Sequence, residues 1–173
     1  MQLIKRPRRL RTNGAIRKMV RENHLLVTDL IYPMFVRYGE NLKKPIPSMP
    51  GIFQYSLDQF ILALEEVAFL NIPAVMLFGI PECKDKVGSG AYDEQGIVQE
   101  AVRLAKKHYP DLYVITDVCM CEYTNHGHCG LIQDGVVLND PTVELLAKIA
   151  VSQAKAGADM VARSSTVESL RTT

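Results

Sequence analysis

The sequence predicts an α/β fold built around a parallel sheet. Short apolar runs of strand length alternate with longer segments whose apolar residues recur at helical spacing. The chain has 173 residues, of which 47% are hydrophobic, enough for one compact domain with a core. The most apolar run, 74–80, is much shorter than the roughly 20 residues of a membrane span. Four strand–helix units fit half of an eightfold barrel or most of a doubly wound sheet, and periodicity leaves both open.

The first two predicted strands flank an amphipathic helix. Residues 30–36 indicate a buried strand, although Pro33 within the run is typical of a strand end or an irregularity. Ser56 begins a helix, and its spacing from Gln59 is that of a capping box. The predicted apolar face of this helix consists of Leu57, Phe60, Ile61, Leu64, Val67 and Ala68. Residues 74–78 are apolar throughout, as expected for a strand covered on both faces.

The remaining units continue the alternation. A second helix is predicted to begin near Asp93, and a third strand to occupy residues 113–118. A third helix follows with Asp140 as its N-cap and Gly157 as its stop signal, and residues 159–162 are the fourth strand. The buried faces are predicted to be Ile97, Ala101, Leu104 and Ala105 in the second helix, and Val143, Leu146, Ala147, Ala150 and Ala154 in the third.

Basic residues are concentrated at the start of the chain. Residues 1–21 contain eight Lys or Arg and no acidic residue, which leaves 12 basic against 19 acidic residues in the remainder. Three interpretations are open: a transit peptide, a nucleic-acid-binding arm, and an arm that docks on an acidic neighbour. The stretch lacks the serines of a transit peptide, and the acidic remainder favours docking. We therefore assign residues 1–24 as a basic N-terminal arm.

Whole-chain charge and cysteine content narrow the functional classes. The net charge of +1 argues neither for nor against a nucleic-acid partner, and four cysteines are too few for a disulfide-stabilised miniprotein. The start of the chain has no secretory pattern, so we expect a reducing, cytoplasmic setting in which cysteines are metal ligands or buried thiols. Cys83 stands alone, and we expect it to be a buried thiol.

The segment 117–130, DVCMCEYTNHGHCG, carries the chemistry. It begins where the third strand ends, and parallel sheets bind ligands at this edge. Cys119, Cys121 and Cys129 follow a C-x-C-x7-C spacing, which allows three thiolates to meet at one borderline cation such as zinc. Three protein ligands leave a coordination position open, as in catalytic zinc sites. The alternative is a set of buried thiols, but their clustering with histidines favours a metal.

Other residues near this segment have weaker signals. Asp117 suits a carboxylate that orients a cationic or amine group, the alternative being an acid that caps the loop. His126 and His128 suit hydrogen bonds that orient the loop better than they suit a second metal. The segment 88–90, Gly-Ser-Gly, lacks the Lys-[Ser/Thr] of a P-loop, so we expect a flexible loop beside the substrate.

Three segments of the chain resemble the porphobilinogen synthase (delta-aminolevulinic acid dehydratase) family. They are residues 6–11 (RPRRLR), residues 49–51 (MPG) and, with much higher specificity, the cysteine segment 117–130. The resemblance implies a TIM (β/α)8 barrel, of which residues 25–162 would form the first half, and an N-terminal arm that wraps a neighbouring subunit in homo-octamers. It implies a lyase that joins two 5-aminolevulinate molecules into porphobilinogen with loss of water, in heme and tetrapyrrole biosynthesis.

The resemblance also implies roles for individual residues. Cys119, Cys121 and Cys129 match the family's catalytic zinc ligands, and Asp117 matches an active-site acid. His128 matches a residue of a secondary zinc site in some members. The family's two Schiff-base lysines and its magnesium-binding acid belong to later barrel strands and have no counterpart here. We therefore expect this chain alone to be inactive, with magnesium dependence a property of the absent strands.

The last residues depart from the family. After Ala162 the family reads APSDMMDG across the strand end, whereas residues 162–169 read ARSSTVES. We therefore set residues 163–173 apart as a divergent tail, for which a frameshift or a truncation is the simplest account. A second hypothesis is a non-catalytic remnant that keeps the metal site and the arm. A third, a nucleic-acid binder that uses the arm, predicts salt-sensitive binding.

Overall fold

The predicted strands form the parallel centre of one sheet in the computed structural model, which describes residues 8–163. The four parallel strands are β1 (Ile31–Arg37), β4 (Ala74–Ile80), β5 (Tyr113–Val118) and β8 (Met160–Arg163), and they lie side by side in this order. Among these four strands the order does not reverse, as it must in a doubly wound sheet. The α/β prediction is thus confirmed, and the doubly wound alternative is wrong for the described residues.

Four short strands were not predicted. β2 (Lys43–Pro45) and β3 (Phe53–Tyr55) extend the sheet beyond β1, β3 parallel to β1 and β2 antiparallel to β3. β6 (Leu131–Gln133) and β7 (Val136–Leu138) form a separate hairpin directly after the cysteine segment. Pro33 lies inside β1, and pairing with β3 begins only at Phe35, so the proline occupies a stretch of β1 that is paired on one side.

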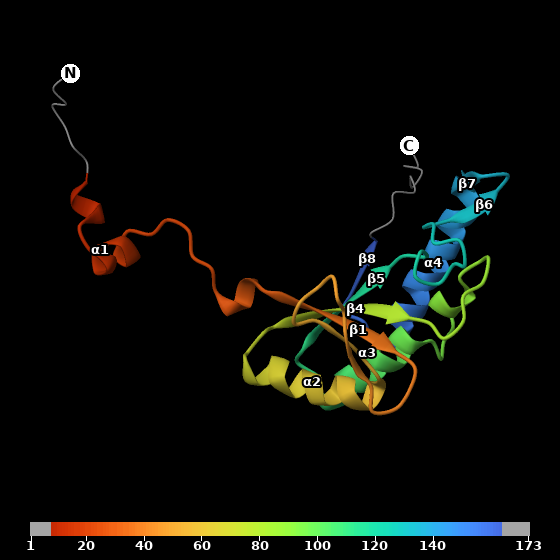
Figure 1. Cartoon of the computed structure of the whole chain (residues 1–173), viewed down its shortest axis with the longest axis horizontal. Coiled ribbons are helices and arrows are strands. Elements are labelled where there is room, and N and C mark those ends of the chain that lie inside the picture. The colour runs from red at the N-terminus through yellow and green to blue at the C-terminus, as the bar shows by residue number, and fades with distance from the viewer. Residues whose placement is uncertain (1–7, 164–173) are drawn as a thin grey trace, which may run out of the picture.

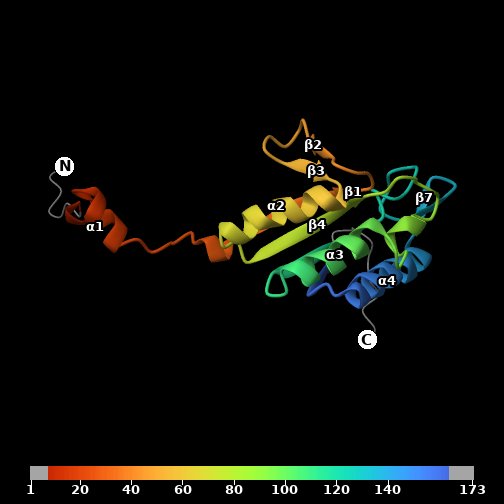
Figure 2. The same ribbon diagram turned by 90° about the horizontal axis from the view of Figure 1, so that it is seen from below.

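Three helices cover the sheet as a row: α2 (Leu57–Phe69), α3 (Ile97–His108) and α4 (Asn139–Ala156) (Figures 1 and 2). Successive helices contact one another. α2 packs on β1 and β3, α3 on β1, β4 and β5, and α4 on β5 and β8. Between this row and the sheet lies the core, whose fully buried members include Met34, Val36, Phe60, Leu64, Val75, Leu77, Ala101, Val102 and Val114. The opposite face of the sheet is more open, with Phe35 and Phe78 stacked there at 5.0 Å between ring centroids.

Two predicted helix starts are wrong because turns occupy the predicted positions. α3 begins at Ile97 with Gly96 as its N-cap, since Asp93 forms a turn in which its backbone carbonyl accepts a hydrogen bond from the Gly96 amide. α4 begins at Asn139 with Leu138 as its N-cap, so Asp140 lies inside the first turn.

The predicted capping box of α2 does not form, although Ser56 is the N-cap. The Ser56 hydroxyl accepts a hydrogen bond from the Leu42 amide at 2.8 Å and makes no capping bond to the helix. The Gln59 side chain donates to Asn41 at 2.9 Å instead. The serine and the glutamine therefore hold the preceding segment against the start of the helix.

The buried faces of the helices also differ from the prediction, most strongly in α4. Of its predicted face only Leu146 is fully buried, whereas Ala147 and Ala154 are exposed. The buried face is Thr142, Leu146, Ile149, Ser152, Gln153 and Ala156. In α2, Ala68 is exposed, and in α3, Leu104 is only partly buried. Hydrophobicity misplaces the α4 face because three polar side chains are buried there.

The described part of the N-terminal arm runs away from the sheet (Figure 1). It contains the 3-10 helix η1 (Arg9–Arg11) and the short helix α1 (Gly14–Met19), and a further 3-10 helix, η2 (Val27–Asp29), lies between the arm and β1. None of the residues in these helices is buried. Among residues 8–163 no helix combines the length and apolar character that crossing a bilayer requires. Residues 1–7 of the arm and 164–173 of the tail lie outside the described residues.

Candidate metal centre

Three cysteine side chains converge directly after β5. The Cys119 sulfur lies 3.2 Å from the Cys121 sulfur and 3.3 Å from the Cys129 sulfur. All three sulfur atoms lie within 4.8 Å of one another, and all three cysteines are free thiols. The structure therefore brings the three predicted ligands together at the carboxyl end of a parallel strand, where the sequence places them.

A tight turn returns the chain to the first two cysteines. The amides of Tyr123 and Thr124 both donate to the Met120 carbonyl at 2.9 Å, and Met120 itself is fully buried. The Thr124 hydroxyl then donates to the His128 carbonyl at 3.0 Å. Gly127, with a φ of 74°, adopts the left-handed conformation that glycine accommodates best. These bonds place Cys129 back beside Cys119.

Two carboxylates adjoin the thiols. Asp117, at the end of β5, forms a second group with Cys119 and Glu122 whose ligand atoms also lie within 4.8 Å of one another. The Cys121 thiol donates to the Glu122 carboxylate, with 3.1 Å between Sγ and Oε2. The sequence analysis missed Glu122, although its position next to Cys121 in the motif was a signal. The site thus offers three sulfur and two carboxylate donors.

Burial disfavours the thiolate form of Cys119 and Cys121 when no ion is bound. It raises the pKa of both Cys119 and Cys121 above the usual range, and for Cys121 the hydrogen bond to Glu122 raises it further. A bound cation reverses this preference, because thiolates are the form that coordinates metals. Three clustered sulfur donors with oxygen donors beside them are a set that suits Zn²⁺.

A second loop, residues 81–91 after β4, is hydrogen-bonded to the cysteine segment. The Asp85 amide donates to the Tyr123 carbonyl at 3.2 Å, and the Asn125 amide donates to the Asp85 carbonyl at 2.9 Å. The Asp85 carboxylate also accepts hydrogen bonds from the Ser89 hydroxyl and amide and from the Val87 amide, and the Ser89 hydroxyl contributes most to lowering the pKa of Asp85. The two loops therefore support each other.

The structure of this loop differs from two predictions made from the sequence. The segment 88–90, expected to be a flexible loop, enters a 3-10 helix (Ser89–Ala91) that the Asp85 carboxylate holds. Cys83, expected to be buried, is exposed because it lies in this loop rather than in a strand or helix. Neither Cys83 nor the segment 88–90 belongs to the cluster of three cysteines.

The two histidines lie at the outer side of the turn. His128 is exposed, and its ring is 5.8 Å from that of His126. The His128 amide donates to Nδ1 of His126 at 3.2 Å, and Nε2 of His126 lies 3.4 Å from the Lys86 carbonyl oxygen. Among the described residues, neither ring belongs to a group of three ligands close enough to share an ion.

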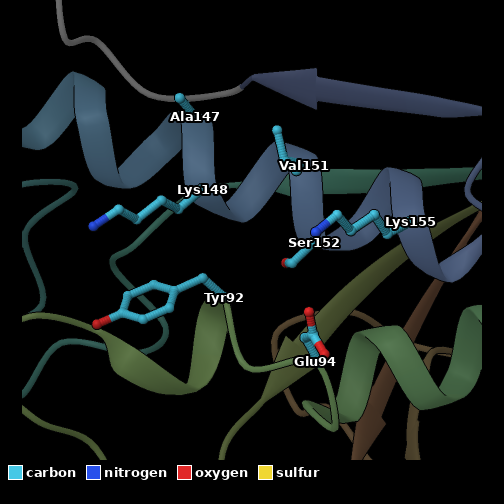
Figure 3. Close-up of a pocket in the computed structure, with 7 residues that line it drawn as sticks. All are labelled: Tyr92, Glu94, Ala147, Lys148, Val151, Ser152 and Lys155. Carbon is cyan, nitrogen blue, oxygen red and sulfur yellow. The ribbon is translucent and has the colours of Figure 1, made fainter.

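A separate pocket of about 400 Å³ lies between α4 and the segment that precedes α3 (Figure 3). Tyr92 and Glu94 form one side, and Lys148, Ser152 and Lys155 of α4 form the other (Figure 3). None of its lining residues belongs to the cysteine segment. Its two lysines therefore lie outside the candidate metal centre.

The family model and the relatives that this chain resembles in sequence carry the same name. The family model described as delta-aminolevulinic acid dehydratase matches residues 4–170, which include most of the segment we set apart as a tail. The chain is 56% identical over 165 residues to the delta-aminolevulinic acid dehydratase of Halalkalibacterium halodurans, covering 95% of this chain and 50% of that protein. It is 52% identical to the Bacillus subtilis protein of the same name, covering 96% and 52%.

A solved structure is similar over the same region. The crystal structure of delta-aminolevulinic acid dehydratase (porphobilinogen synthase) from Toxoplasma gondii ME49, in complex with its reaction product porphobilinogen, matches with a TM-score of 0.91 and 36% sequence identity. The match covers 96% of this chain and 48% of that one. The chain thus spans about half the length of the relatives named here.

Proposed function

This chain belongs to the delta-aminolevulinic acid dehydratase family, and from that premise we propose that it is the zinc-holding half of a porphobilinogen synthase. The reaction joins two molecules of 5-aminolevulinate into porphobilinogen with loss of water, in heme and tetrapyrrole biosynthesis. The observation that carries the proposal is the convergence of three free thiols at the carboxyl edge of the sheet.

The four parallel strands are proposed to be the first half of a (β/α)8 barrel. Their sequential order and the single row of helices are features of a barrel wall. At the β8 edge, apolar side chains of α4 and β8 such as Val143, Ala147 and Val161 line an open cavity of about 330 Å³. A further strand–helix unit would cover this surface and extend the wall.

Each site residue has a proposed role. Cys119, Cys121 and Cys129 hold the ion, which when bound would polarise a substrate oxygen or lower the pKa of a water. Asp117, at the end of β5, orients the amine of a substrate on the open face of the sheet. Its strand end is fixed by Gln153, whose side chain donates to the Asp117 carbonyl at 3.1 Å. The ordered turn holds the thiols in place before substrate arrives.

The remaining proposals concern further metal ions and the cellular setting. His128 is proposed for a secondary zinc site because its exposed ring is accessible to a ligand from elsewhere. Magnesium would bind to acids outside these 173 residues. A reducing, cytoplasmic setting is part of the proposal, because the three thiols must stay reduced to coordinate an ion.

The arm is proposed to join copies of the chain into a homo-oligomer, an octamer by resemblance. It leaves the apolar side chains of Leu10, Met19 and Val20 exposed alongside its basic residues. Such an extended segment buries this surface only against another molecule. Deletion of residues 1–24 should lower the mass measured by sedimentation equilibrium, and an unchanged mass would refute this role.

Zinc titration tests the metal site directly. We expect the chain to bind one zinc ion per molecule, and a variant with all three cysteines replaced by serine to bind none at this site. Circular dichroism of both proteins provides the folding control. Failure of the unmodified chain to bind zinc would refute the proposed metal centre.

A chimaera tests the reaction. Residues 8–163 would replace the matching segment of the full-length B. subtilis relative, and porphobilinogen formation from 5-aminolevulinate would be measured. We expect an active chimaera that loses activity on Cys119→Ser, whereas the 173-residue chain alone should be inactive for lack of Schiff-base lysines. Zinc binding without chimaera activity would favour the non-catalytic remnant instead.

A further inference from the structure

A cavity of about 260 Å³ lies at the carboxyl edge of the sheet, between the end of β1, the loop after β4 and the start of α3. We propose that this rim cavity binds a small organic cation, a ligand that carries a primary ammonium group on a short carbon chain. Its lining includes Tyr38, Glu82, Asp85, Ser89, Ile97 and Tyr123. The inference goes beyond the proposed function and does not depend on an ion at the cysteines.

The hydroxyl of Tyr123 is a polar group without a partner in the protein. Tyr123 is 6% exposed, and its hydroxyl makes no hydrogen bond to any residue within 8–163. Buried polar groups are normally hydrogen-bonded, so this oxygen is suited to a partner from outside the chain. Because Tyr123 lines the rim cavity, an ammonium N–H of a ligand there could donate to the phenol oxygen.

The charges around the rim cavity are mainly negative. Its lining contains the carboxylates of Glu82 and Asp85 and one ammonium group, that of the exposed Lys84. Burial raises the pKa of Tyr38, and three nearby carboxylates raise it further by repulsion. They are those of Glu100, Asp93 and Glu82. Glu82 makes no ion pair with any described residue, so its charge is available to a ligand. The excess of negative charge favours a cation over an anion.

The remaining features of the cavity favour an organic cation over a bare metal ion. Two tyrosines line it, and aromatic rings attract ammonium groups, while Ile97 offers an apolar wall to a carbon chain. The volume is below the roughly 300–1,000 Å³ of cavities that hold drug-sized ligands, so the ligand must be small. Among residues 8–163, the groups of three ligand atoms close enough to share an ion lie within 117–129, and the cavity contains none of them.

The rim cavity lies on the helix side of the sheet, away from the open face on which Asp117 is proposed to orient substrate. Gly79 of β4 pairs with Val36, whose side chain belongs to the core beneath the helices. The Tyr123 hydroxyl lies where a side chain on Gly79 would be, so it is on that same side. An ammonium group in the rim cavity would therefore occupy a second site, distinct from the proposed substrate site.

Butylammonium, butanol and pentanoate test the chemical class of the ligand, because they share a butyl chain and differ in the charge of the head group. Binding of each to the full 173-residue chain, without zinc, would be followed by two-dimensional NMR of the backbone amides. We expect butylammonium to bind about tenfold more tightly than the other two and to shift the amides of residues 82–90. Equal affinities of the three probes, or shifts confined to other parts of the chain, would overturn the inference.

Two variants test the residues that would hold the ammonium group. Tyr123→Phe removes the hydroxyl and keeps the ring, and we expect it to weaken butylammonium binding about fivefold. Glu82→Gln, at an exposed position where folding is not at risk, should weaken it about threefold. The matched controls are Tyr113→Phe, at the opposite end of the sheet, and Glu144→Gln, on the exposed side of α4, and both should bind like the unmodified chain. Unchanged affinity in Tyr123→Phe and Glu82→Gln alike would refute the site.

Asp117→Asn separates the rim cavity from the proposed substrate site. Its neutral side chain should leave butylammonium binding in the rim cavity unchanged. Loss of binding in Asp117→Asn, with Glu82→Gln unaffected, would place the ammonium group on the open face of the sheet and overturn the inference. Because the probes are measured without zinc, a failure of the metal centre appears only in the zinc titration and a failure of the rim cavity only here.

Discussion

A Cβ atom on Gly79 would lie 1.9 Å from the hydroxyl oxygen of Tyr123 and 2.7 Å from a methyl carbon of Val98. Gly79 is a buried residue of β4, and Tyr123 is a buried residue of the turn that carries the cysteines. The missing side chain on one strand therefore creates the space that seats the loop following the next strand. Burial raises the pKa of Tyr123 above its usual range, so the phenol stays neutral there.

Gly79→Ala should disturb the proposed metal centre without replacing any of its proposed ligands. The new methyl group would displace the Tyr123 ring, and overpacking of this kind typically costs about 1–3 kcal/mol. We expect zinc affinity to fall about tenfold as the turn moves. Chemical denaturation and chelator competition measure the two effects.

Gly90→Ala is the matched control, because its Cβ would meet Tyr123 at 3.5 Å, an ordinary van der Waals contact. This variant should bind zinc like the unmodified chain. Equal zinc affinities in Gly79→Ala and the unmodified chain would show that the ring does not position the thiols.

The sequence predicts strands of this fold better than helix ends. The third predicted strand, 113–118, coincides with β5, because its short apolar run follows Pro110 and Asp111, which favour a turn. The start of α3 was misplaced by four residues, since Asp93 is as suitable for a turn as for a helix cap. Local propensity does not distinguish these uses, and contacts with the rest of the fold decide between them.

The candidate site likewise has features that the sequence predicts and features that it does not. The cysteine trio is predictable because ligand type, spacing and position at a strand end all agree. The support from Asp85 was not predictable, since its amide and carbonyl bond to a loop about 40 residues later in the chain. The room for Tyr123 at Gly79 depends on the register of packed elements, which hydrophobic periodicity does not specify.

A buried polar side chain links α3 to α4. The Gln99 side-chain amide donates to the Ala91 carbonyl at 2.9 Å and to the Ser152 hydroxyl at 2.8 Å, and Gln99 is 1% exposed. Gln99→Leu should destabilise the fold by about 1–3 kcal/mol, because it leaves the buried Ala91 carbonyl without this bond. Chemical denaturation measures the change.

Gln133→Leu, at an exposed position of β6, is the control and should change stability by less than about 0.5 kcal/mol. A Gln99→Leu variant as stable as the control would mean that the hydrogen bonds add nothing beyond the packing of the side chain.

Asp159 makes the stability dependent on pH. Its carboxylate accepts a hydrogen bond from the Val114 amide at 2.8 Å and pairs with the Lys106 ammonium at 2.9 Å. Partial burial raises the pKa of Asp159, but these two partners outweigh it and lower the pKa below the usual value. The stabilisation is therefore present above the unfolded-state pKa of about 3.9 and is lost as the pH falls through the folded-state value.

Asp159→Asn should lower the free energy of unfolding by about 1 kcal/mol at pH 7, a modest effect because the pair is partly exposed to solvent. The difference from the unmodified chain should shrink as the pH falls below about 4. Asp111→Asn, at an exposed position, is the control. A difference that stays constant from pH 7 to pH 3 would contradict the assignment to the Asp159 carboxylate.

Thr142 of α4 connects the cysteine segment to the helix that follows it. Its buried hydroxyl accepts a hydrogen bond from the Leu131 amide at 2.9 Å and donates to the Leu138 carbonyl, which ties both strands of the β6–β7 hairpin to the helix. Gly130, one residue after Cys129, packs so closely that a Cβ there would lie 2.9 Å from the same hydroxyl oxygen.

Thr142→Val keeps the shape of this side chain and removes both hydrogen bonds. The Leu131 amide would lose its partner close to Cys129, the last of the three proposed zinc ligands, so we expect a loss of about 1–2 kcal/mol in unfolding free energy. Zinc affinity should fall several-fold, because the return of Cys129 to the other thiols depends on where the hairpin begins. Thr28→Val, at an exposed position between the arm and β1, should change neither quantity. Destabilisation with unchanged zinc affinity would mean that the turn at residues 120–128 positions Cys129 without help from the hairpin.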